Sequence, residues 1–72
     1  MRLIHFHCET GCDKAVKFDS FHSVIENKNE NTCTISIVDG GKEELFTTAM
    51  TLRQIMEKLI GSRSIIYISA SQ

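Results

Sequence analysis

Residues near the start of the chain have side chains that can bind a metal ion: His5, His7, Cys8 and Cys12. Zinc is held in proteins by thiolate sulfurs and imidazole nitrogens that converge in a tetrahedron. On a strand, His5 and His7 share one face while Cys8 points to the other. Cys12 follows a turn and could reach either side. The sequence therefore raises zinc as a cofactor, held by these residues.

The same side chains also have a purely structural interpretation. Free cysteine commonly packs as a small hydrophobic residue, so Cys8 and Cys33 are candidates for the core. His5 and His7 would then be polar residues on an exposed strand face. Three cysteines are an odd number, which fits a complete disulfide framework poorly. Reduced thiols and a cytoplasmic location are the simpler expectation.

Catalytic and nucleotide-binding motifs are absent from the 72 residues. Gly40 and Gly41 stand in a turn, and neither GxGxxG nor GxxxxGK[ST] occurs. Glu43 and Glu44 are neighbours on a predicted strand, so their side chains face opposite ways and cannot form an acid–base pair. A domain of this size buries only about 60% of the surface of its unfolded chain, which leaves little structure for a pocket. We therefore expect a single, non-enzymatic domain over residues 1–72.

Charge and hydropathy restrict the partners of this domain. The net charge is −1 and the Lys and Arg residues are scattered, which argues against a general nucleic-acid binder because such binding needs concentrated positive charge. A small patch of Arg53, Lys58 and Arg63 leaves a nucleic-acid-associated regulator as a further alternative. No apolar run reaches the roughly 18 residues of a membrane span, so no membrane partner is expected.

The clearest local signals belong to a helix. Thr51 is the expected N-cap, and Gln54 is its partner in a capping box. An amphipathic stripe follows at i, i+3, i+4, i+7 and i+8, formed by Leu52, Ile55, Met56, Leu59 and Ile60. Gly61 comes directly after the stripe, where a left-handed C-terminal cap is typical.

Most of the remaining chain predicts strands. Alternating or β-branched residues mark strands at 2–8, 14–18, 33–37, 43–48 and 64–69. Asp39–Lys42 is a hairpin turn, and the segment from Phe21 to Ile25 is either a short turn beneath the sheet or a further strand. The expected fold class is α+β: an antiparallel sheet of about four to five strands with one C-terminal amphipathic helix and a short last strand. The expected core comprises Ile4, Phe6, Val16, Phe18, Ile35, Ile37, Leu45, Leu52, Ile55, Met56, Leu59 and Ile66.

The layout from about Val16 to Ile60 resembles the small FlbD-type flagellar regulators. Residues 18–24 correspond to the turn segment of that family, residues 34–42 to its hairpin and residues 51–59 to its short final helix. The resemblance is one of pattern and includes no catalytic motif. It implies the fold, and no function is carried over from it because similar folds host unrelated functions.

The last predicted strand carries the functional hypothesis. Its residues Ile65, Ile66, Tyr67 and Ile68 would give it two apolar faces. Such a strand is a liability if its edge is left bare, so it either inserts into the sheet or pairs with another chain. We expect a regulatory or interaction module that acts by protein–protein contact through this edge, with a homodimer as the simplest form. Zinc binding is the alternative.

Overall fold

The computed structural model describes residues 1–9, 11 and 13–71 and is a small α+β domain. Its first half contains β1 (Leu3–Cys8), β2 (Lys14–Lys17), a short 3-10 helix η1 (Phe18–Ser20) and β3 (Phe21–Asn27). Its second half contains β4 (Thr32–Asp39), β5 (Lys42–Thr48), α1 (Leu52–Ile60) and β6 (Ile65–Ala70). The α+β class, the capped helix and the final strand are confirmed.

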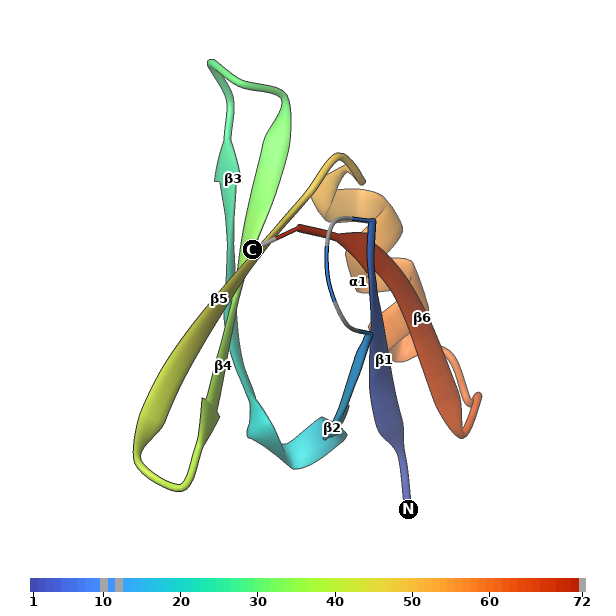
Figure 1. Cartoon of the computed structure of the whole chain (residues 1–72). Helices are drawn as coiled ribbons and strands as arrows, with labels where there is room; N and C mark the ends of the chain where they lie inside the picture. Colours follow the sequence, from blue (N-terminus) through green and yellow to red (C-terminus); the bar gives the residue numbers. More distant parts are fainter. Residues whose placement is uncertain (10, 12, 72) are drawn as a thin grey trace.

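The strands form two three-stranded sheets and not one larger sheet. Sheet A has the order β2-β1-β6, and sheet B is the antiparallel meander β3-β4-β5. In Figure 1 the two sheets face each other, with β3, β4 and β5 on the left and β1 and β6 on the right. The prediction of a single sheet was wrong because η1 turns the chain from β2 in one sheet to β3 in the other. The segment from Phe21 to Ile25 therefore belongs to a further strand.

The first and last strands are neighbours and run parallel, with Leu3 opposite Ile65 and Cys8 opposite Ala70. A parallel pair needs a long crossover, and here α1 lies within it. The predicted all-antiparallel arrangement is therefore also wrong for sheet A. Beyond β6, the backbones of Thr47 and Ser71 exchange two hydrogen bonds of 2.7 Å, which join the two sheets at a second corner.

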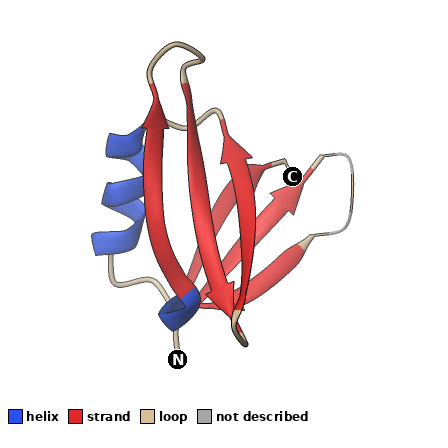
Figure 2. Ribbon diagram, turned by 90° about the vertical axis from the view of Figure 1, so that its left-hand side faces the viewer, coloured by secondary structure: helices blue, strands red, loops and turns tan. Residues whose placement is uncertain are grey.

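The core fills the space between the two sheets. Phe6 from sheet A stacks on Phe46 from sheet B, with ring centroids 4.0 Å apart. Helix α1 lies along one side of the sheets (Figure 2), contacts β3 and β6, and buries Ile55 completely. Phe18, Leu52 and Leu59 are partly buried and pack against the core. The fully or nearly fully buried residues otherwise include the expected Ile4, Phe6, Val16, Ile35, Ile37 and Ile66.

Two expected core residues are instead exposed: Leu45 by 52% and Met56 by 48%. On β5, the residue opposite the buried Ile35 is Phe46, so Phe46 points inward and Leu45 points to solvent. On α1, Ile55 occupies the centre of the buried stripe, and Met56 lies around the helix toward solvent.

The turns and caps explain why the chain changes direction where it does. Thr51 and Gln54 form both hydrogen bonds of the predicted capping box, at 3.1 and 3.0 Å. Gly40 and Gly41 form the tight loop between β4 and β5 with φ of 61° and 81°, which glycine adopts at little cost. Gly61 was expected to be left-handed, but its φ is −60°.

The end of α1 is closed by a side chain and not by a left-handed residue. The guanidinium of Arg2 donates hydrogen bonds to the carbonyl oxygens of Leu59, Gly61 and Arg63, at 3.2, 2.6 and 3.1 Å. Leu59 is in the last turn of α1, where carbonyls have no partner within the helix, and Gly61 and Arg63 belong to the connection that follows it. The same guanidinium lies 4.4 Å from the centre of the Phe18 ring. Arg2 therefore ties β1 to the end of α1 and to η1.

Candidate functional site

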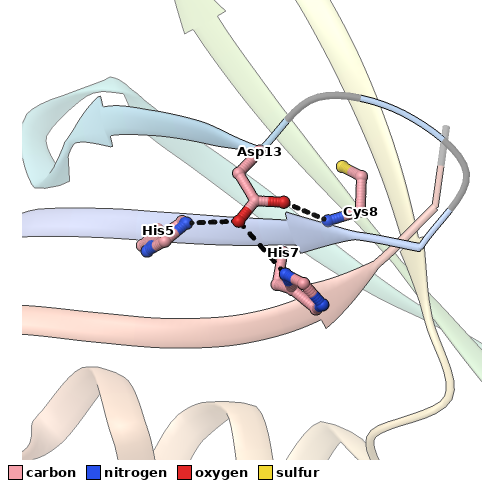
Figure 3. A network of polar contacts seen from close by, with 4 residues as sticks. All are labelled: His5, His7, Cys8 and Asp13. Atoms are coloured by element: carbon pink, nitrogen blue, oxygen red, sulfur yellow. Dashed lines mark hydrogen bonds and ion pairs between the residues drawn. The ribbon is translucent and has the colours of Figure 1, made fainter.

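The residues predicted to bind zinc are only partly brought together. His5 and His7 project from one face of β1, and each ring lies 3.1 Å from Oδ2 of Asp13 (Figure 3). The second carboxylate oxygen, Oδ1, accepts a hydrogen bond of 3.2 Å from the backbone N–H of Cys8. Asp13 was not singled out from the sequence, because its place beside both histidines depends on how β2 returns along β1.

The thiol of Cys8 lies apart from this cluster. Cys8 is buried on the core face of β1 and is a free cysteine, as is Cys33. The predicted ligand Cys12 lies outside the described residues. Among the residues that are described, no group of three or more His, Cys, Asp and Glu side chains is arranged to hold a metal ion.

Asp13 in this cluster and Cys33 on β4 have shifted pKa values. The hydrogen bond from His7 holds the pKa of Asp13 below its ordinary value, with the Cys8 N–H and His5 acting in the same direction. Burial raises the pKa of the Cys33 thiol, and the nearby charge of Glu26 adds to the effect. Reactive cysteines have lowered pKa values in electropositive settings, so Cys33 has the character of an inert core residue.

β6, which contains the predicted interaction residues, is an edge strand of sheet A, with β1 on its other side. The Leu3 N–H donates to the Ser64 carbonyl at 2.8 Å. In a parallel ladder alternate residues bond to the neighbour, so Ile66 and Ile68 direct their backbone groups to β1. Ile65 and Tyr67 direct theirs away from the sheet, and these outward groups are here called the β6 edge.

The side chains of β6 alternate and do not form two equivalent apolar faces. Ile66 and Ile68 are buried in the core, whereas Ile65 is 41% exposed and Tyr67 55% exposed. The Tyr67 ring lies 5.3 Å from the His5 ring, centre to centre, on the outer face of sheet A. Toward its end the strand is closed off, because Thr48 Oγ1 donates a hydrogen bond of 2.6 Å to the Ser69 carbonyl. The open part is therefore the first half of β6.

A groove of about 570 Å³ runs between this half of β6 and α1. Its floor and walls combine Ile65, Ile66 and Tyr67 of β6 with Met50, Gln54, Glu57, Lys58 and the Gly61–Arg63 connection. Of the cationic patch predicted from the sequence, Lys58 and Arg63 line the groove. Arg53 does not, and it pairs with Glu57 at 3.7 Å. The sequence analysis singled out the β6 residues and the cations Lys58 and Arg63. It did not predict that α1 lies beside β6, because that arrangement depends on the tertiary fold.

Comparison with known proteins found no matching family model, no matching curated protein and no matching solved structure. In the described part of the chain, none of the helices combines the length and apolar character that crossing a bilayer requires.

Proposed function

We propose that this chain is a small, non-enzymatic interaction module with a regulatory role, which binds another protein chain by accepting a strand at the β6 edge. The observation that carries the proposal is the contrast between β6 and the other outer strands. β2 contains Lys14 and Lys17, β3 contains Glu26, and β5 contains Lys42, Glu43 and Glu44. The β6 sequence, Ile-Ile-Tyr-Ile-Ser-Ala, has no charged residue.

Charged side chains on edge strands discourage pairing with other chains. The outer strands β2, β3 and β5 carry this protection, and β6 lacks it. An incoming strand would bond to the outward N–H and C=O groups of Ile65 and Tyr67, and its side chains would pack against theirs. This is the β-augmentation mode of peptide recognition, in which backbone hydrogen bonds provide affinity and neighbouring side chains provide specificity.

The incoming strand can belong to a second copy of the chain or to a different protein. A second copy would pair its own β6 across a two-fold axis and give the homodimer expected from the sequence. A reducing, cytoplasmic setting belongs to the same proposal and is supported by the free, buried thiols of Cys8 and Cys33.

Amide hydrogen exchange measured by NMR tests strand addition directly. In the monomer the N–H groups of Ile65 and Tyr67 should exchange fast, whereas those of Ile66 and Ile68 are already bonded to β1. Raising the protein concentration, or adding a binding peptide, should slow exchange at Ile65 and Tyr67 specifically. If both amides are slow in a dilute monomer, or stay fast in every complex formed, the proposal fails.

A substitution pair separates the edge from general surface effects. Tyr67→Lys puts a charge on the open edge, and Leu45→Lys puts the same charge on a residue of similar exposure, 55% against 52%, in the other sheet. Tyr67→Lys should abolish strand addition and Leu45→Lys should preserve it, with circular dichroism confirming that both variants fold. Equal loss of binding in the two variants would contradict the proposal.

Zinc binding is a separate proposal, favoured by the two histidines that converge on Asp13. It would require Cys8 to leave the core if the predicted set of His5, His7, Cys8 and Cys12 is complete. Native mass spectrometry on zinc-replete protein measures how much zinc is bound. One zinc per chain in the parent protein, and none in the His5→Ala/His7→Ala variant, would support the site. Protein that stays metal-free in excess zinc rejects it.

A further inference from the structure

Building on the proposed strand addition, we infer that the natural occupant of the groove between β6 and α1 is an extended segment of another protein in which apolar residues alternate with acidic ones. Side chains of a strand point alternately to opposite sides. One set of an added strand would lie beside Ile65 and Tyr67 on the outer face of sheet A. The other set would point toward Gln54 and Lys58 on α1.

The outer set should be apolar or aromatic. Ile65 and Tyr67 are large side chains that remain about half exposed, at 41% and 55%. Directly opposed aromatic and β-branched residues on neighbouring strands stabilise a sheet. A strand that presents such residues would cover both side chains.

The set that faces α1 should carry carboxylates, because the groove has an uncompensated positive charge. Lys58 and Arg63 line it, and among the described residues neither has an ion-pair partner. The one acidic residue in the lining, Glu57, is already paired with Arg53.

The carbonyl groups at and just after the end of α1 do not use these two cations either. Arg2 donates its hydrogen bonds to the carbonyl oxygens of Leu59, Gly61 and Arg63. The positive ends of Lys58 and Arg63 are therefore left for a ligand.

A second copy of this chain fits the same groove less well. It would offer Ile65–Ala70, which contains no acidic residue, so Lys58 and Arg63 would gain no counter-charge. The charges therefore favour a foreign, acidic strand over self-pairing, although both would use the β6 edge.

Three short synthetic peptides test the inference, each acetylated and amidated so that only the side chains carry charge. They alternate valine with glutamate, with serine or with lysine, and binding is measured by fluorescence anisotropy at low and high salt. The glutamate peptide should bind most tightly and the lysine peptide most weakly. The advantage of glutamate over serine should shrink at high salt because salt screens exposed charges.

The Lys58→Gln/Arg63→Gln variant should lower affinity for the glutamate peptide by roughly tenfold and leave the serine peptide unchanged. Lys17→Gln/Lys28→Gln is the matched control, because it removes the same charge from exposed positions outside the groove. The control should bind both peptides as the parent chain does.

The outcomes separate this inference from the proposed function. Equal binding of all three peptides with protection of the Tyr67 amide would overturn the acidic preference and keep strand addition. A tight dimer formed through β6 would also overturn the preference for an acidic strand while supporting strand addition at β6. No protection of Ile65 or Tyr67 with any peptide, together with a monomer at all concentrations, would overturn both.

Discussion

The rings of Phe6 and Phe46 stack face to face between the two sheets, with centroids 4.0 Å apart and planes inclined by only 3°. Both residues are completely buried, and they come from β1 and β5, which lie in different sheets. This pair is therefore an apolar contact that joins sheet A to sheet B.

Removing the contact between Phe6 and Phe46 should lower the stability of the fold. Phe46→Ala is expected to lower the free energy of unfolding by about 3–5 kcal/mol, since it loses both buried apolar surface and the stacked partner. The neighbouring Leu45→Ala should change it by no more than about 0.5 kcal/mol because Leu45 faces solvent. Urea unfolding of the two variants measures the difference. Similar losses at both positions would mean that the strand register is not the one described.

The Arg2 side chain should stabilise the fold through the end of α1. Arg2→Gln is expected to lower the free energy of unfolding by about 1–2 kcal/mol, because three carbonyl groups lose a charged donor. Arg53→Gln removes an equal charge from an exposed pair on α1 and should cost about 0–0.5 kcal/mol. Chemical denaturation compares the two, and an equal effect would argue against the capping role.

The glycines should respond to alanine in opposite directions. Gly40→Ala and Gly41→Ala are each expected to destabilise by about 1–2 kcal/mol, because both residues have a positive φ. Gly61 has an ordinary φ of −60°, and a Cβ there would meet its nearest atoms at 3.5 and 3.6 Å. Gly61→Ala should therefore stabilise by about 0.4–1 kcal/mol through the unfolded state. Thermal unfolding distinguishes these signs.

Asp13 should make stability fall in acid. Its pKa is lowered in the folded chain from an ordinary value of 3.8, chiefly by the His7 hydrogen bond. Its contribution is therefore fully present above the unfolded-state pKa and is lost as the pH falls through the folded-state pKa. The parent chain should have a higher Tm than Asp13→Asn at mildly acidic pH. In stronger acid the two Tm values should become equal. A difference that does not change with pH would contradict this assignment.

Local signals in the sequence were sufficient for the hairpin and the helix. The capping box at Thr51 and the turn at Gly40 and Gly41 depend on residues a few positions apart, and both are present. Non-local features were not accessible in the same way. The pairing of β6 with β1, the separation into two sheets at η1 and the inward choice of Phe46 over Leu45 depend on segments that meet only in the folded chain.

The candidate site likewise combines local features that the sequence reveals with spatial neighbours that it does not. The sequence predicted Ile65–Ile68 as interaction residues from their composition, and it predicted Arg53, Lys58 and Arg63 as a small patch for nucleic acid, of which only Lys58 and Arg63 line the groove. It did not place α1 beside β6 or Asp13 beside the two histidines. Both are neighbours in space whose positions follow from the crossover and from the return of β2.

The parallel pairing of β1 with β6 also determines when the domain can be completed. Arg2 and Arg63 are 61 positions apart, whereas β3, β4 and β5 are joined by short turns. Distant contacts must overcome a larger loop-closure entropy and form slowly. A nascent chain still lacking β6 can build the meander but cannot close the core around Phe6. Pulsed hydrogen exchange during refolding should therefore protect amides of β4 and β5 before those of β1, and simultaneous protection would show that the two sheets form together.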